Sequence, residues 1–321
     1  MILTFIEHDR GVLNGTTLET LTVGRRLAEQ QNSPLHAILI GAAAQPLAAA
    51  LQAYGVTVVH LVQHEQLDDY APAAWAQSVV EIMANTQPMA VLAAGSDRGN
   101  EVMAHVAART DLPLATNCTD VQLGEPCIVT RLRWGGSLLE EAQLNGAPAL
   151  LTIAEHAVAA EEAPAGELTV HVVTPTLSAS DWQVRIVSRV EATTGKVALA
   201  DARVVVGGGR GVGSAAGFQI LEALAAQLDG AVGCSRAVTS VGWRPHADQV
   251  GQTGTRIAPV LYIACGISGA IQHIVGCKGA KQILAINTDP NASIVAAADY
   301  AVIGDLHKVI PALVAALKQR K

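Results

Sequence analysis

The stretch VGQTGTRIAPVLYIACGISGAIQH, residues 250–273, decides the fold of the second half of this chain. It joins a polar loop, residues 250–254, to an apolar run, residues 258–265, that is long enough for one buried strand. The run stops at Gly266, and Ser268 is a natural N-cap for a helix that we expect to begin there. A strand that leads into a glycine-bearing helix start offers free N–H groups to a phosphate. The stretch therefore predicts an α/β domain that binds a phosphate-bearing ligand.

Length and composition favour two domains of the same class. A chain of 321 residues is longer than one domain with a single hydrophobic core usually is. Its residues are 50% hydrophobic and rich in Ala, Val, Ile and Leu, which suits buried parallel strands covered by helices. The net charge of −7, without a basic run that interleaves with aromatic residues, argues against nucleic acid as a partner. We see no signal peptide and no apolar stretch of about twenty residues, so we expect a cytoplasmic protein without a membrane span.

The cysteines give no sign of a disulfide framework or a metal site. They are five, an odd number, and no CxxC pair occurs among them. We expect buried thiols in a reducing compartment, and no metal. The five are Cys118, Cys127, Cys234, Cys265 and Cys277.

The first half alternates strand and helix patterns, which predicts βαβ units and a mostly parallel sheet flanked by helices. The expected strands are 2–7, 35–40, 56–62 and 90–94, and the expected helices are 16–31, 45–54, 73–85 and 100–109. Shorter stretches at 127–132 and 149–153, separated by turn signals, are interpreted as antiparallel strands added to this sheet. Two segments of the connection that follows, 168–173 and 182–190, are candidate edge strands. We place the first domain at residues 1–190.

The second domain, residues 200–321, is predicted to be doubly wound. Its first strand, 202–206, runs into the glycine-rich segment 207–213 and a helix at 216–228. Further strands are expected at 231–234, 260–264, 283–287 and 300–303, with a closing helix at 306–318.

The glycine-rich segment has two interpretations. No Lys-Ser or Lys-Thr pair follows it, which excludes a P-loop. From Gly211 to Ala216 it fits the looser GxGxxA dinucleotide pattern, yet the next strand ends without the acid that would hold a ribose. The alternative is a strand-to-helix turn that needs positive φ at several positions. Arg210, among these glycines, is well placed to pair with an anion.

Other strand ends carry polar residues that suit a ligand or have ordinary structural uses. Arg236 follows the strand 231–234, although an arginine on a loop is usually just solvated. His273, one turn into the helix expected at Ser268, is either a neutral donor or a structural histidine. Asp305 could accept a ribose hydroxyl or cap the last helix, and Asn287 closes a strand that is followed by possible helix caps; capping is the commoner role. No nucleophile elbow, HExxH motif or catalytic pair of acids is visible, so the chain looks able to hold a cofactor without transforming a substrate.

Several of these segments together resemble the alpha subunit of electron transfer flavoproteins. Residues 261–273, LYIACGISGAIQH, are similar to the C-terminal signature of that family. The resemblance covers about residue 204 to the end, in order, and the first half matches more loosely. The other matching segments are 208–211, 234–237, 250–254, 285–290, 298–300 and 304–306, with 6–8 and 94–96 in the first half.

The resemblance implies one FAD, held mostly by the second domain and completed by a separate beta subunit. Thr253 would then hydrogen-bond near flavin N5, His273 would approach the O2 carbonyl, and Arg236 would place positive charge beside the ring. One charge at roughly 4 Å contributes on the order of 4 kcal/mol at an effective dielectric of about 20. By family analogy the FAD contacts are Arg210, Ser235, Arg236, Val250, Gly251, Gln252, Thr253, Ser268, Gly269, Ala270, Ile271, Gln272, His273, Asn287, Asp305 and Leu306.

The function that the resemblance implies is electron transport, without substrate chemistry of its own. The carrier would accept electrons from dehydrogenases, such as the acyl-CoA dehydrogenases of fatty acid β-oxidation, and pass them singly to a membrane quinone oxidoreductase. One alternative is the branch linked to nitrogen fixation or electron bifurcation, whose bifurcating forms carry a second FAD in the beta subunit. Two more distant alternatives are an NAD-dependent enzyme and a nucleotide-sensing module in the first half.

Overall fold

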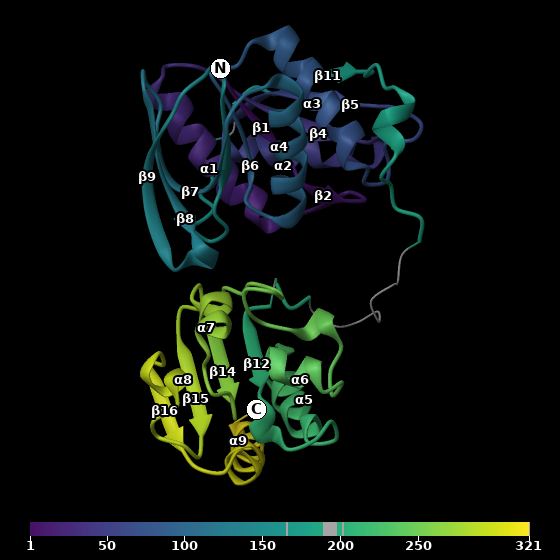
Figure 1. The fold of residues 1–321 in the computed structure, drawn as a ribbon. Helices are drawn as coiled ribbons and strands as arrows, with labels where there is room; N and C mark the ends of the chain where they lie inside the picture. The colour runs from purple at the N-terminus through teal and green to yellow at the C-terminus, as the bar shows by residue number, and fades with distance from the viewer. Residues whose placement is uncertain (165, 189–197, 201, 321) are drawn as a thin grey trace. The chain divides into compact units, whose positions relative to one another are not determined.

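The computed structural model describes residues 1–164, 166–188, 198–200 and 202–320 (Figure 1). The chain divides into two compact units, residues 1–190 and 191–321, each with its own sheet and its own hydrophobic clusters. Both units are α/β, with large, mostly parallel sheets flanked by helices, as predicted. Among the described residues, no helix is long and apolar enough to cross a membrane.

The sheet of unit 1 has nine strands within its described residues, in the order β11-β5-β4-β1-β6-β10-β7-β8-β9. The strands from β11 to β7 are parallel, and β8 and β9 extend the sheet as antiparallel hairpins. Their bounds are β1 (Ile2–Phe5), β4 (Leu35–Ile40), β5 (Val56–Val62), β6 (Ala90–Ala94), β7 (Leu114–Gln122), β8 (Cys127–Arg133), β9 (Leu138–Leu144), β10 (Ala149–Ile153) and β11 (Thr169–Val173). A two-stranded ribbon, β2 (His8–Asp9) with β3 (Val12–Leu13), follows β1.

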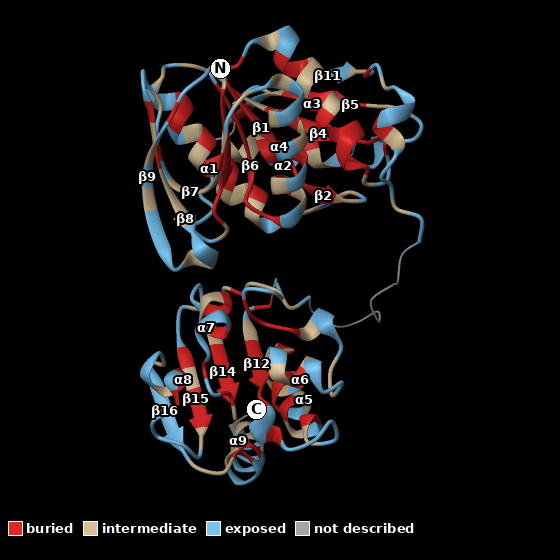
Figure 2. Ribbon diagram, in the orientation of Figure 1, coloured by how far each residue is buried: buried red, intermediate tan, exposed pale blue. Residues whose placement is uncertain are grey.

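Helices cover both faces of this sheet, because alternate residues of its strands point to opposite sides. Ile2 belongs to a cluster with α1 (Gly15–Gln30), whereas Leu3 belongs to a cluster with α3 (Pro72–Thr86) and α4 (Asp97–Thr110). The central strands are buried on both faces (Figure 2).

Three expectations for unit 1 need correction. The predicted helix 45–54 is a series of short turns, η1 (Ala42–Leu47), α2 (Ala48–Leu51) and η2 (Gln52–Tyr54), because Pro46 interrupts helical hydrogen bonding. The strand β10 is parallel to both neighbours, not antiparallel. It lies inside the sheet with all five residues buried, which is typical of a parallel strand.

The third correction concerns the segment 182–190. Its described part, residues 182–188, contains no strand, and residues 189 and 190 lie outside the described residues. Asp181, which is buried, bonds to the Ser178 backbone and hydroxyl and pairs with Arg109 Nη2 at 2.5 Å. These contacts hold η4 (Ala179–Trp182) as a capped turn. The other candidate, 168–173, is indeed the edge strand β11.

Unit 2 has a five-stranded sheet in the order β13-β12-β14-β15-β16, with every pair parallel in the part described. One face packs on α5 and α9, and the other on α7 and α8, so the unit is doubly wound. The bounds are β12 (Val204–Gly208), α5 (Phe218–Gln227), β13 (Ala231–Cys234), α6 (Arg236–Ser240), β14 (Leu261–Cys265), α7 (Ile271–Cys277), β15 (Ile283–Asn287), α8 (Ser293–Ala296), β16 (Tyr300–Ile303) and α9 (Leu306–Arg320).

Candidate functional site

The strand order of unit 2 identifies where a ligand should bind. From β12 the chain moves to one side, to β13, and then crosses to β14 on the other side. The carboxyl ends of β12 and β14 therefore flank a topological switch point, the place where open parallel sheets bind their ligands. The glycine-rich segment follows β12, and Gly266 follows β14.

A pocket of about 180 Å³ opens at this edge of the sheet. It brings together eleven of the sixteen predicted FAD contacts, together with three residues outside that set, Ala237, Gln249 and Ile267. No carboxylate lines it, and Arg236 does, so it is electrostatically suited to an anionic ligand. The eleven are Ser235, Arg236, Val250, Gly251, Gln252, Thr253, Ser268, Gly269, Ala270, Gln272 and His273.

The other five predicted contacts lie outside this pocket. Arg210 is exposed after β12, and Ile271 is 69% exposed at the start of α7. Asn287 donates to the Ile267 carbonyl at 2.8 Å, which ties the end of β15 to the pocket wall. Asp305 accepts a hydrogen bond from the His307 backbone at 2.9 Å, so it does cap α9. Leu306 is buried in the core.

The helix expected at Ser268 begins three residues later, at Ile271. Gly269 has φ +81°, outside the helical region, and its Cα approaches the Ile294 backbone so closely that any side chain would overlap it. Ala270 is not helical, with φ −54° and ψ 147°, and no side chain caps the helix. The prediction that Ser268 is the N-cap was therefore wrong, because a tertiary contact at Gly269 overrides the local signal. His273 is the third residue of the helix.

The glycine-rich segment serves close packing, and positive φ is not its main requirement. Within it, Gly213 alone has a positive φ, whereas Gly209 is extended. A Cβ on Gly211 would lie 2.7 Å from the Gly266 Cα, and one on Gly209 would overlap the Gly266 carbonyl. The interpretation that several positions need positive φ was wrong. These glycines let the loops after β12 and β14 meet at the switch point.

Three polar side chains, with the buried Gln249 at their centre, support the loop that contains Thr253. Gln249 is 2% exposed, and its side-chain nitrogen donates to Thr253 Oγ1 at 3.0 Å. Its side-chain oxygen accepts from Thr239 Oγ1, on α6, at 2.7 Å. Thr253 itself is exposed in the pocket. Sequence reasoning missed Gln249 because nothing local distinguishes a buried glutamine in a polar loop.

His273 is a buried, neutral histidine paired with a tyrosine. Its Nε2 lies 2.8 Å from the hydroxyl of Tyr262, a fully buried residue on β14. Burial lowers the pKa of His273 to about 4, and a weaker interaction of the ring with the Val250 backbone acts in the opposite direction and raises this pKa. Burial also raises the pKa of Tyr262, so its hydroxyl keeps its proton. If Tyr262 donates to Nε2, the ring proton lies on Nδ1, which has no hydrogen bond of good geometry with any described residue.

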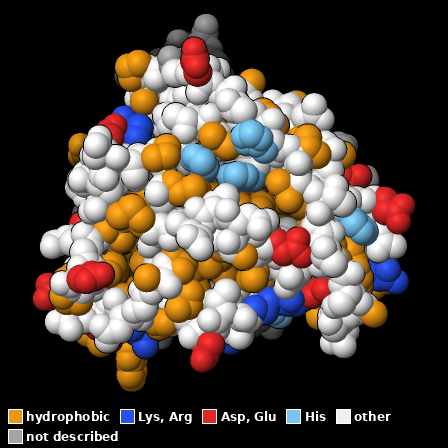
Figure 3. All heavy atoms as spheres, turned by 90° about the horizontal axis from the view of Figure 1, so that it is seen from above, with side chains coloured by type: hydrophobic (Ala, Val, Ile, Leu, Met, Phe, Trp, Pro, Cys, Tyr) orange, Lys and Arg blue, Asp and Glu red, His pale blue; other side chains and the backbone are white. Residues whose placement is uncertain are grey.

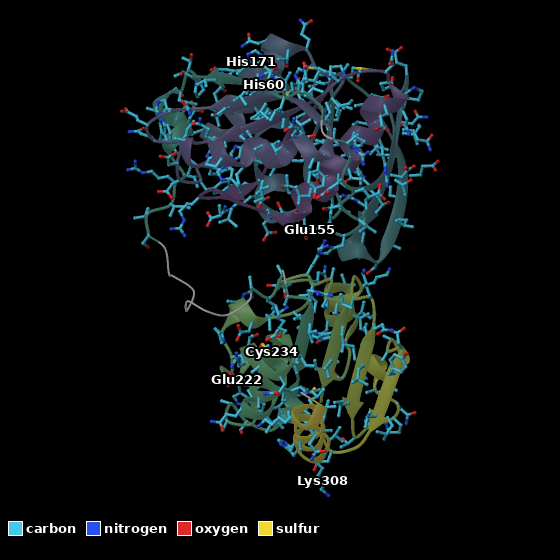
Figure 4. All side chains as sticks on the ribbon, turned by 180° about the vertical axis from the view of Figure 1, so that it is seen from behind. His60, Glu155, His171, Glu222, Cys234 and Lys308 are labelled. Carbon is cyan, nitrogen blue, oxygen red and sulfur yellow. The ribbon has the colours of Figure 1, made fainter. Side chains whose placement is uncertain are left out.

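Arg244 braces the start of the pocket loop, and the sequence analysis did not single it out. Its guanidinium donates to Glu222 on α5 at 2.6 Å and to Asp248 at 2.7 Å, and lies over the Phe218 ring. Figure 4 labels Glu222, which lies on α5. The spacing of Arg244 and Asp248 gives no helical signal, because Arg244 and Pro245 lie outside any helix, so this pair could be identified only from the structure.

The size of the pocket limits what it encloses. Sites for complete drug-sized ligands usually measure about 300–1,000 Å³. At about 180 Å³ this one accommodates one part of a dinucleotide, and the remainder would extend along the carboxyl edge toward Arg210, Asn287 and Asp305. The buried Nδ1 of His273 and the exposed hydroxyl of Thr253 are groups that a ligand ring could satisfy. The residues present therefore fit FAD in chemical type.

The rest of the described chain offers weaker candidates. A larger open groove of about 670 Å³ in unit 1 lies beside β11, and no charged side chain lines it. Among the described residues, no group of three or more His, Cys, Asp or Glu side chains is arranged to hold a metal ion. All five cysteines are buried free thiols.

Comparison with known proteins covers almost the whole chain. The family model for the electron transfer flavoprotein domain matches residues 2–178, and that for the electron transfer flavoprotein FAD-binding domain matches residues 198–278. An electron transfer flavoprotein subunit alpha of Mycobacterium tuberculosis is 38% identical over 100% of this chain and 99% of its own. The electron transfer flavoprotein subunit alpha of Thermoanaerobacterium thermosaccharolyticum is 34% identical to this chain, over 99% of this chain and 97% of its own length. Protein FixB of Azorhizobium caulinodans is 36% identical to this chain, over 98% of this chain and 88% of its own length.

Proposed function

Because this chain belongs to the family of electron transfer flavoprotein alpha subunits, we propose that it holds one FAD at the carboxyl edge of unit 2. Proteins of this family are electron carriers that convert no substrate, and their alpha subunits pair with a beta subunit. In our proposal this chain accepts electrons from dehydrogenases, such as acyl-CoA dehydrogenases, and delivers them to a membrane quinone oxidoreductase. The observation that carries the assignment is the acid-free pocket at the carboxyl edge of the sheet, lined by eleven residues singled out as FAD contacts.

The loop from Ser268 to Ala270 would take the pyrophosphate. It lies at the carboxyl edge, and Gly269 lets its backbone turn sharply there. Arg210, at the same edge, would add a guanidinium that pairs with phosphate oxygens. Asn287 and Asp305, at the ends of β15 and β16, would face the adenosine half.

Three side chains of the pocket would surround the flavin ring. FAD, when bound, takes up and releases electrons one at a time. Thr253 would offer its hydroxyl near N5, and His273 would offer the N–H of a neutral imidazole near O2. Because burial keeps His273 uncharged at neutral pH, Arg236 supplies the positive charge of the pocket lining. A cation beside the ring favours the negative charge that reduction adds.

The test is to produce the full chain together with its beta subunit. We expect a yellow complex that releases one FAD per heterodimer on heating and is bleached by an acyl-CoA dehydrogenase and its substrate. Arg236→Lys should keep the charge, whereas Arg236→Gln should lower the midpoint potential at unchanged FAD content. A heterodimer that stays colourless after reconstitution with FAD would overturn the proposal.

The likeness to proteins named FixB supports a second candidate, the branch linked to nitrogen fixation or electron bifurcation. The bifurcating forms of that branch carry a second FAD in the beta subunit. Two flavins per purified heterodimer would favour this function, and one flavin would favour the first.

A further inference from the structure

Gln249 lies between the hydroxyl groups of Thr239 and Thr253 and forms part of the pocket wall. In the arrangement described above, Thr239 donates to the Gln249 oxygen and the Gln249 nitrogen donates to Thr253 Oγ1. Since Thr253 Oγ1 already accepts this bond, its own proton is available to a group in the pocket. Thr253 thus faces the pocket as a donor.

The same three side chains can be connected with the opposite polarity. An amide has a donor and an acceptor, and a hydroxyl is both, so a half-turn of the Gln249 amide reverses each bond. Thr239 then accepts from Gln249 and donates to a second acceptor, the Arg236 carbonyl oxygen, which is 3.0 Å from its Oγ1. Thr253 donates to the Gln249 oxygen and faces the pocket as an acceptor. The Thr253 proton is donated to a ligand group in the first arrangement and to Gln249 in the second, the Thr239 proton is donated to Gln249 or to the Arg236 carbonyl, and no covalent bond forms or breaks.

We propose that Gln249 is a positioning residue that lets Thr253 switch between donor and acceptor toward the ligand ring. The proposal rests on the FAD site proposed above. The N5 atom of oxidised flavin accepts a hydrogen bond, and after reduction and protonation it carries an N–H that donates. The electrons come from the partner dehydrogenase and the proton from water, and the relay supplies neither. A threonine of fixed polarity would favour one form of FAD, whereas the Thr239–Gln249–Thr253 relay satisfies both.

The test substitutes Gln249 and determines the Kd of the heterodimer separately for oxidised and for reduced FAD. Gln249→Met preserves length and burial but removes both ends of the amide. Thr253 can still donate to oxidised FAD, but its proton has no acceptor when it must accept from reduced FAD. We expect the Kd for reduced FAD to rise about three- to tenfold relative to that for oxidised FAD. The Kd for oxidised FAD comes from titration of the heterodimer, and the ratio follows from the midpoint potential through the thermodynamic cycle.

A double-mutant cycle separates positioning from general damage. If Gln249 acts through Thr253, the ratio should change less than twofold when Gln249→Met is added to Thr253→Val. Gln219→Met, an exposed substitution of the same type on α5, is the matched control and should leave the ratio unchanged. If Gln249→Met does not fold, Thr239→Val replaces it, since it removes the far end of the relay and should raise the same ratio.

The outcomes distinguish this inference from the function on which it rests. A wild-type heterodimer without FAD overturns both. A wild-type heterodimer with FAD, combined with an unchanged ratio in Gln249→Met, overturns the relay alone. An equal change of the ratio in the wild-type and Thr253→Val backgrounds also overturns the relay, because Gln249 would then act by another route.

Discussion

Burial of His273 couples the protonation of one side chain to the stability of unit 2. The folded pKa of about 4 lies below the ordinary value of 6.5, so the unfolded chain binds a proton in a range where the folded chain does not. Stability that is present near pH 7 is therefore lost as the pH falls from about 6.5 toward 4. The difference between the two pKa values corresponds to about 3 kcal/mol in total.

We predict that His273→Gln reduces the pH dependence of unfolding. Between pH 7 and pH 5, wild-type unit 2 should lose about 2 kcal/mol more unfolding free energy than the variant, because glutamine does not titrate. Urea unfolding of both proteins at several pH values measures this difference. Equal slopes for the two proteins would show that His273 is accessible to protons in the folded state.

Two neighbouring glycines should respond differently to alanine. Gly209→Ala forces a methyl group against the Gly266 carbonyl and within 2.7 Å of the Ile267 Cα, so we expect a loss of about 2–4 kcal/mol and weaker FAD binding. In Gly213→Ala the added methyl group has no neighbour within 4 Å, so the only loss of stability comes from placing alanine at a positive φ, about 1 kcal/mol. Thermal unfolding of the two variants gives the comparison. A larger loss for Gly213→Ala would contradict the packing role assigned to Gly209.

Histidines on three adjacent strands of unit 1 make another part of the fold sensitive to pH. His36 Nδ1 on β4 lies 3.2 Å from His60 Nε2 on β5, and His171 on β11 stacks on His60. Figure 3 shows histidine side chains gathered on one face of the molecule, and Figure 4 labels His60 and His171. Burial, and then the charge of His60, lowers the pKa of His36 to about 4. Burial also lowers the pKa of His60.

We predict that this cluster destabilises the β4–β5–β11 edge in acid. Both folded pKa values are lowered, so the cluster favours folding near pH 7 and opposes it as the pH falls below about 6.5. His36 is only partly buried, so after allowance for solvent the loss by pH 5 should be about 1 kcal/mol. Amide exchange of β11 measures the effect, with His60→Gln as the variant that should reduce it. Acid-independent exchange of β11 would contradict the prediction.

The bounds of a strand could be predicted from the sequence where a short apolar run defines the strand without help from distant contacts. The runs that became β4, β5, β6, β13, β15 and β16 have the bounds that the sequence indicates, because each is a short, mostly apolar run that a change in composition ends on both sides; this holds even for the exposed edge strand β16. The direction of β10 and the start of α7 depend on contacts with distant segments, at β6 and at Ile294, and no local pattern encodes those.

The sequence predicted which residues at the ends of strands would form the candidate site, but it predicted few of the hydrogen bonds among them. Residues such as Ser235 and Thr253 follow predicted strands or resemble a family segment, and the structure brings them to one pocket. Gln249 and Tyr262 act through partners ten or more residues away, Thr239 and His273, so their roles required coordinates.

The division of the whole chain into two units places all sixteen proposed FAD contacts in unit 2. Ligand binding stabilises whatever folds to form the site and leaves an independently folding unit unchanged. The cysteines report on both units, because Cys118 and Cys127 are buried in unit 1 and Cys234, Cys265 and Cys277 in unit 2. Burial raises the pKa of each thiol, so labelling requires opening of the surrounding structure.

We predict that FAD slows thiol labelling in unit 2 alone. At a free FAD concentration of 100 Kd, with the beta subunit held constant, the open population of unit 2 should fall about 100-fold, equivalent to about 2.7 kcal/mol. Labelling of Cys234, Cys265 and Cys277 should slow by that factor, while Cys118 and Cys127 keep their rates. Mass spectrometry of the labelled peptides resolves each cysteine in one experiment. Protection that spreads equally to unit 1 would show that the two units unfold as one, and protection confined to unit 1 would place FAD in the wrong unit.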